Sequence, residues 1–166
     1  MRILLALMMI LAGAATAQAQ AKNGQRFGDW TLRCVAQGPG QTSCALRQRV
    51  TRADTNELLA DVSLNMAQVQ GTPRVLMVVV TPDGVALNIA PGFIVDGEGD
   101  AVNLSWRTCS QNLCRAAALL SPQQQGAVMA GLEMRLGYNR FQSEQTTVLP
   151  VSLKGVTAGL AALSTR

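Results

Sequence analysis

The chain has 166 residues, a formal net charge of +4, and a composition in which 48% of the residues are hydrophobic. This length suits one domain with a buried core, and nucleic-acid-binding domains usually concentrate more basic charge, so we expect no nucleic-acid partner. The sequence contains no histidine, which excludes Ser–His–Asp and Cys–His catalysis and removes the commonest metal ligand. An enzyme would have to use carboxylates, lysine, tyrosine or arginine. We predict a protein that is not an enzyme and has no catalytic residues, no cofactor and no metal.

The segment 1–21 has the features of a secretory signal peptide. Arg2 supplies positive charge, residues 3–15 are apolar or small, and cleavage is expected near Ala17, Ala19 or Ala21. The apolar run is shorter than the roughly 20 residues that span a bilayer, and no later segment replaces it. We therefore predict one mature domain over 22–166 that is not an integral membrane protein. It would lie in the periplasm, be secreted, or lie at the cell surface.

Export also determines the state of the four cysteines, because thiols outside the cytoplasm are normally oxidised. Three pairings are possible, and the spacing favours Cys34 with Cys44 and Cys109 with Cys114. A redox centre would need a Cys-x-x-Cys motif, and zinc would need reduced thiolates in closely spaced pairs. We therefore predict two structural disulfides, each closing a short loop.

The mature chain has the pattern of short strands separated by turns, which is typical of an antiparallel sandwich or barrel. Residues 75–80 are apolar on both faces and predict a central strand. A hairpin turn is expected over 96–100, where glycines permit a positive φ. The other predicted strands cover 27–35, 44–50, 57–69, 85–89, 93–95, 101–108, 115–120, 132–141 and 147–151.

Two short helices are predicted among these strands. Ser121 and Pro122 begin the first helix with a serine cap and a proline, and Gly131 ends it. Ser152 is expected to cap a C-terminal helix, whose apolar positions recur at helical spacing at Leu153, Val156, Leu160 and Leu163. In the strand over 132–141, we expect one face to carry Leu132, Met134, Leu136 and Tyr138.

The order of several motifs resembles the invasion-associated locus B (IalB) family of exported bacterial proteins. Phe27 to Cys34 is similar to an opening Phe-x-Asp-Trp-x-x-x-Cys, and residues 152–155, Ser-Leu-Lys-Gly, are similar to a C-terminal Ser-Leu-x-Gly-Phe. Residues 82–85 and 92–97 resemble glycine-containing turns of the family, and the cysteines occur in the expected order. The chain departs from the pattern at Leu113, where a glycine is common, and at Val156, where an aromatic residue is common.

This resemblance implies an all-β, antiparallel, immunoglobulin-like sandwich that is exported and closed by disulfides. It also implies an association with host-cell entry in some bacteria. It supplies no catalytic residues, because the family has none that are agreed.

Candidate binding residues are few. Arg33, Arg47, Arg49 and Arg52 would form a basic stripe on adjacent strands, suited to anionic lipid, glycan or nucleic acid, or else an ordinary charged face. Oxygen ligands for calcium are available at Asp96, Glu98 and Asp100, although a solvated hairpin explains them equally well.

Asp29 with Trp30 suggests either a recognition patch or a structural pair, and we favour the structural interpretation. The leading hypothesis is a non-enzymatic protein that binds an unknown protein or ligand at the envelope or host surface, in an oligomeric state that the sequence leaves open. One alternative is a periplasmic structural or assembly factor that uses a sheet edge. Another is a hydrolase that uses Asp29, Asp96, Glu98 and Asp100.

Overall fold

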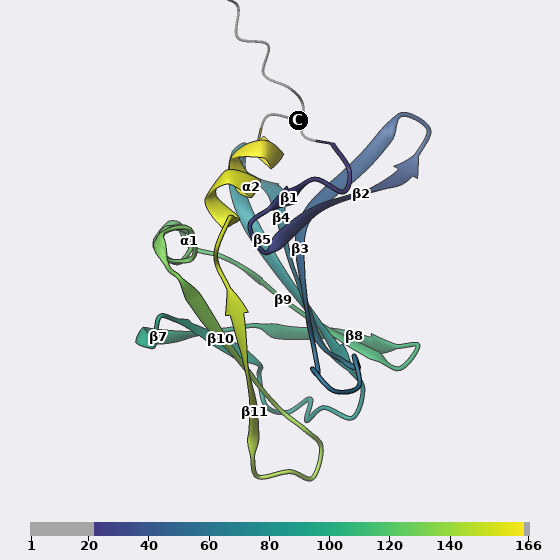
Figure 1. The fold of residues 1–166 in the computed structure, drawn as a ribbon, viewed down its shortest axis with the longest axis vertical. Coiled ribbons are helices and arrows are strands. Elements are labelled where there is room, and N and C mark those ends of the chain that lie inside the picture. The colour runs from purple at the N-terminus through teal and green to yellow at the C-terminus, as the bar shows by residue number, and fades with distance from the viewer. Residues whose placement is uncertain (1–21, 165–166) are drawn as a thin grey trace, which may run out of the picture.

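The computed structural model describes residues 22–164, which form two antiparallel sheets and two short helices (Figure 1). The larger sheet has seven strands in the order β1-β2-β3-β4-β5-β9-β8, and the smaller has four in the order β11-β10-β6-β7. The strands of the larger sheet are β1 (Arg26–Phe27), β2 (Trp30–Gly38), β3 (Gln41–Thr51), β4 (Leu58–Val69), β5 (Thr72–Pro82), β8 (Ser105–Ser110) and β9 (Leu113–Leu119). Those of the smaller sheet are β6 (Gly92–Val95), β7 (Glu98–Asn103), β10 (Glu133–Asn139) and β11 (Thr146–Ser152). The predicted all-β sandwich with two short helices is confirmed.

The core lies between the two sheets and is built from alternate residues of each strand. Leu32, Leu46, Leu64 and Met77 follow one another across four neighbouring strands of the larger sheet, and each is fully buried. The smaller sheet contributes Phe93, Met134 and Leu136. Burial of such side chains stabilises a fold by about 1.5–3 kcal/mol each. These residues therefore fix which face of each strand lies on the core, and the residues between them face outward.

The strand β5 lies inside the larger sheet, between β4 and β9, as its apolar sequence predicts. Val75, Met77 and Val79 are fully buried, whereas Leu76, Val78 and Val80 on the other face are half-buried. The outer face of this sheet is therefore apolar at its centre.

The predicted strand over 101–108 is divided between the two sheets. The chain leaves β7 at Asn103 and enters β8 of the larger sheet at Ser105, with the buried Leu104 between them. Alternation has the same period in both sheets, so the sequence pattern does not reveal such a crossing. The predicted strand over 85–89 is also absent, since Val85 makes a single bridge to Arg140 and the following residues turn.

The hairpin between β6 and β7 turns at two residues, Asp96 and Gly97. Both have a positive φ, of 51° and 74°, as a type I′ turn requires. Glu98 already belongs to β7.

Helix α1 (Pro122–Ala130) begins with the predicted capping box, in which Ser121 and Gln124 exchange hydrogen bonds. Gly131 follows its end in an extended conformation (φ −73°), so it is not a left-handed cap. A Cβ there would collide with Val95. The strand β10 begins at Glu133, and the preceding Leu132, which we expected on the buried face, is 81% exposed.

Helix α2 (Val156–Ser164) packs on the larger sheet at the end where β1 lies (Figure 1). The expected apolar residues, Leu153, Val156, Leu160 and Leu163, are all buried. Ser152 does not cap this helix, because it ends strand β11 four residues earlier.

Candidate functional site

Three of the four predicted arginines lie together on the outer face of the larger sheet. Arg33 belongs to β2, and Arg47 and Arg49 belong to β3, where neighbouring residues Leu32 and Leu46 face the core. Alternation along each strand therefore directs these arginines to solvent. The side chains of Arg47 and Arg49 are 48% and 61% exposed.

An aspartate of the next strand lies beneath two of these arginines. Asp61 is opposite Arg49 in the β3–β4 register, and its side chain is only 4% exposed. Nε of Arg47 donates to Oδ1 of Asp61 over 2.5 Å, and Nε of Arg49 lies 3.7 Å from Oδ2. The hydrogen bond to Asp61 raises the pKa of Arg47. One buried carboxylate thus holds two guanidinium groups, and a net positive charge is left at the surface.

The second carboxylate oxygen of Asp61 differs from the first in its partners. Among residues 22–164, Oδ2 accepts no hydrogen bond, and Arg49 is its ion-pair partner. A buried charge without partners is costly, and losing one partner is more costly than losing both. The two arginines are therefore tied to the buried acid that they cover.

The arginines line a recess of about 490 Å³. Its other polar lining residues are Asn23, Asp29, Thr31 and Gln48, and the carboxylate of Asp29 accepts from the Ser152 hydroxyl. Arg52 does not line it, because Arg52 lies at the turn between β3 and β4, where its Nε pairs with Oε2 of Glu57 over 3.2 Å. The predicted stripe is therefore a cluster of three arginines with Arg52 apart from it.

Asp29 and Trp30 hold the two sheets together at Ser152. The indole Nε1 of Trp30 donates to the carbonyl oxygen of Ser152 over 2.8 Å, and the Ser152 hydroxyl donates to Oδ2 of Asp29 over 2.7 Å. The side-chain amide of Gln48 completes the joint: it donates to the oxygen of Ser152 and accepts from its nitrogen, each over 3.1 Å. Trp30 is fully buried, and these contacts support the structural interpretation of the Asp29–Trp30 pair.

Two glycines permit the chain segments at this joint to approach closely. Gly28 and Gly155 have φ values of +57° and +97°. A Cβ on Gly28 would collide with the carbonyl oxygen of Lys154, and one on Gly155 with that of Phe27. The N-terminal and C-terminal motifs noted in the sequence therefore form one structural unit.

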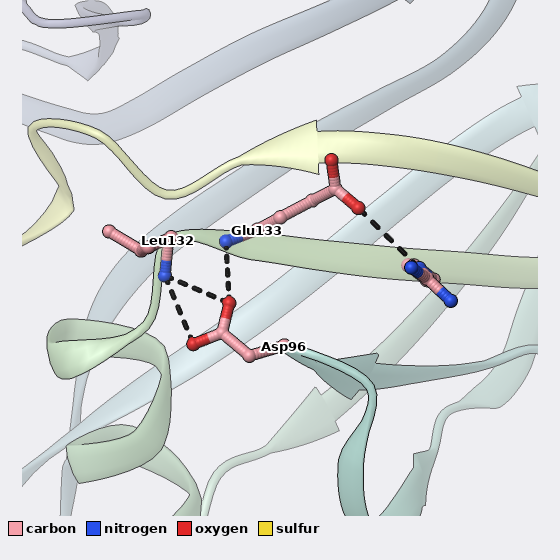
Figure 2. A network of polar contacts seen from close by, with 4 residues as sticks. Asp96, Leu132 and Glu133 are labelled. Carbon is pink, nitrogen blue, oxygen red and sulfur yellow. Dashed lines mark hydrogen bonds and ion pairs between the residues drawn. The ribbon is translucent and has the colours of Figure 1, made fainter.

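The three carboxylates considered for calcium are not gathered into one group. Figure 2 shows Asp96 accepting hydrogen bonds from the backbone nitrogens of Leu132 (3.0 and 3.2 Å) and Glu133 (2.9 Å). Asp96 thereby ties the β6–β7 hairpin to the start of β10. Glu98 and Asp100 instead line a separate recess of about 270 Å³ beside α1. Within 22–164, no three His, Cys, Asp or Glu residues are placed to hold a metal ion.

The disulfides join directly opposed residues of adjacent strands. Cys34 is paired with Cys44 across β2 and β3, and Cys109 with Cys114 across β8 and β9. The loops that they close span sequence separations of 10 and 5 residues. In the chain-entropy model such loops contribute roughly 2–3 kcal/mol each to stability.

Sequence reasoning did not identify Asp61 or Gln48. The available signal for Asp61 was an aspartate that follows three apolar residues and precedes Val62 in a predicted strand. An acid at such a position needs a cationic partner, and Arg47 and Arg49 were the nearest candidates on the neighbouring predicted strand. Nothing local to Gln48 indicates that it contacts Ser152, which is 104 residues away.

These features define an antiparallel β-sandwich stabilised by two disulfides, with a cluster of arginines on one outer face. The chain belongs to the invasion associated locus B (IalB) protein family, whose sequence model matches residues 30–164. The family is exported and is not a known enzyme family.

The structure is similar to the crystal structure of invasion associated protein b from Bartonella henselae, with a TM-score of 0.72 and 20% sequence identity. The similarity covers 85% of this chain and 94% of the other. No curated protein matches the sequence. The disulfides fit a location outside the cytoplasm. None of the helices within 22–164 is long and apolar enough to cross a membrane. The predicted signal peptide lies outside the described residues.

Proposed function

We propose that the chain is an exported binding protein without catalytic activity, which acts at the bacterial envelope or at a host surface after its signal peptide is removed. Membership of an exported family and the two disulfides support the location. The observation that carries the binding role is the placement of Asp61, buried beneath the exposed guanidinium groups of Arg47 and Arg49. A sheet that only needed solvent-exposed charge would not require a buried acid to hold it in place.

Two of the four acidic residues considered for hydrolysis, Asp29 and Asp96, are engaged in structural contacts, which supports a role without catalysis. Asp29 accepts from Ser152, and Asp96 accepts from two backbone amides. Glycoside hydrolysis of the usual kind needs two carboxylates on either side of one scissile bond. Asp29 and Asp96 are instead part of the contacts that hold separate strands together.

Strand addition at a sheet edge is less well supported. The edge strand β1 has two residues, β11 carries Pro150, and β7 carries Glu98 and Asp100. Short edges, proline and charge are the features with which proteins prevent pairing with another chain. The remaining edge strand, β8, carries Arg107 and a register shift between Trp106 and Thr108. Within residues 22–164, each edge strand therefore has a feature that disfavours the addition of another strand.

Gene deletion and complementation test the proposed function. The deletion strain should enter cultured host cells less efficiently or have a weakened envelope, and the wild-type gene should restore the phenotype. A gene encoding Arg33→Ala, Arg47→Ala and Arg49→Ala should fail to restore it, whereas Arg135→Ala, which removes a charge from the other sheet, should succeed. Full restoration by the triple variant, at equal protein level, would show that the arginine face is not the binding surface.

A further inference from the structure

We propose that the arginine recess binds the anionic groups of an acidic polysaccharide, with Arg33, Arg47 and Arg49 as ligands and Asp61 as a positioning residue. This inference rests on the proposed binding function and names its ligand class.

The free hydrogen-bond donors suit sulfate, phosphate or carboxylate groups. A guanidinium has five N–H donors in a planar fork that matches such oxyanions. Asp61 engages Nε of Arg47, which leaves the terminal amino groups of that side chain, and it lies 3.7 Å from Nε of Arg49. The two arginines are two residues apart on one strand, about 7 Å along β3. The recess can therefore receive more than one anionic group of a repeating chain.

Asp61 reduces the cost of binding by holding the arginines before the ligand arrives. Free arginine side chains lose rotamer entropy when they are immobilised, and prior ordering avoids part of that loss. The buried carboxylate accepts from Arg47 and faces Arg49, so both side chains lean over the same point of β4. Arg33, on the other side of β3, lines the same recess.

The surroundings favour a polysaccharide over a lipid surface. Of the large apolar side chains that are exposed, Val35 is the one that lines this recess, and it is 61% exposed. Leu132, which is 81% exposed, lines an adjoining recess with Arg49, whereas the exposed Leu87, Ile89, Leu113, Leu119, Phe141 and Val148 line neither recess. Two exposed large apolar side chains, Val35 and Leu132, are therefore near these arginines, which is little apolar surface to insert into a membrane. The Thr31 hydroxyl and the Asn23 side chain instead add groups that hydrogen-bond sugar hydroxyls.

Calorimetry of the mature, disulfide-bonded protein tests the inference with four probes: a heparin-type sulfated octasaccharide, neutral dextran, inorganic sulfate, and phosphatidylglycerol vesicles. We expect binding of the octasaccharide, weaker binding of sulfate, and none of dextran or vesicles. Vesicle binding as tight as that of the octasaccharide would assign the site to a lipid surface. Equal affinity for free sulfate and for the octasaccharide would show that no polymer is recognised. Either result, or no octasaccharide binding, overturns the inference.

Substitutions locate the site. Arg47→Ala and Arg49→Ala should each weaken octasaccharide binding about tenfold or more, and each should lower the slope of log K against log salt by about one. Arg49→Lys keeps the charge and loses the fork, so it should also weaken binding. The matched control Arg135→Ala should change affinity less than about twofold, because Arg135 lies on the smaller sheet.

Asp61→Asn separates positioning from simple attraction. The substitution removes one negative charge from the face, so general attraction predicts tighter binding, whereas loss of positioning predicts weaker binding. We expect affinity to fall in a protein whose circular dichroism is unchanged, and tighter binding would overturn the role of Asp61. If Asp61→Asn does not fold, Arg49→Lys decides whether fork geometry or charge matters. Lack of glycan binding, together with failed complementation by the triple arginine variant, would refute the ligand class and leave the proposed function standing.

Discussion

The contact between Gln48 and Ser152 should carry a measurable part of the stability of the fold. Gln48 lies on β3 of the larger sheet and Ser152 ends β11 of the smaller one, so the amide joins the two layers. Gln48→Met keeps the length of the side chain and removes both of its polar atoms. The substitution leaves the backbone nitrogen of Ser152 without the acceptor that it has in the structure.

The magnitude follows from the bonds lost. Loss of the 3.1 Å bond from Gln48 to the Ser152 oxygen costs about 1 kcal/mol, and leaving the part-buried Ser152 N–H without its acceptor costs about 1–3 kcal/mol. The carbonyl oxygen of Ser152 keeps its bond from Trp30, so it adds no further cost. We expect a loss of about 2–4 kcal/mol, a large share of the 5–15 kcal/mol that stabilises a typical domain. The melting temperature should fall by about 6–12 °C.

Urea unfolding followed by tryptophan fluorescence measures this loss. The midpoint should move to lower urea while the slope m stays the same, because the native surface is little changed. Gln68→Met is the matched control, since Gln68 is exposed on β4 and should change stability by less than about 0.5 kcal/mol. A Gln48→Met protein as stable as this control would refute the claim that the amide holds the sheets together.

Two further predictions concern glycine geometry and alkaline pH. Gly155→Ala should destabilise the fold by about 2 kcal/mol or more, because φ is +97° and a Cβ would meet the carbonyl of Phe27. Gly126→Ala in α1 has open space around the new Cβ and should raise the stability of the fold by about 0.5–1 kcal/mol. Equal melting temperatures for the two variants would contradict this account. Burial raises the pKa of Tyr138 above its ordinary value of 10.0, so the folded state keeps this proton to higher pH than the unfolded state does. Stability should therefore fall as pH rises above about 10, and this fall should be smaller in Tyr138→Phe when urea midpoints are compared between pH 9 and pH 11.

Local patterns were sufficient to predict much of this fold. The alternation of buried residues in β2, β3 and β5, and the capping box of α1, are properties of short segments, and the structure has them where the sequence places them. The pairing of Cys34 with Cys44 is also local, because a short turn places the two residues opposite each other. In each case the residues that determine the structure are near one another in the chain.

The remaining features depend on contacts between distant segments. The crossing at Leu104 from one sheet to the other leaves the period of alternation unchanged, so no pattern marks it. Leu132 continues the alternation of β10 but lies before the point where the smaller sheet begins, and it is exposed. The sequence predicts a stripe of four arginines across adjacent strands, and the structure places Arg52 apart from the other three. The role of Asp61 required the β3–β4 register, which places it opposite Arg49 and beside Arg47.

The position of the family motifs also bears on where ligand specificity resides. The residues by which the chain resembles the family, from Phe27 to Cys34 and from Ser152 to Gly155, are engaged with one another at the joint between the sheets. The residues at the joint, Gly28, Asp29, Trp30, Ser152 and Gly155, therefore account for a shared fold, whereas Thr31 and Arg33 of the first motif line the recess. Apart from Arg33, the proposed ligand-binding arginines and Asp61 lie outside those motifs. Two members of the family can thus have the same sandwich and bind different partners, because the fold and the recess depend on different residues.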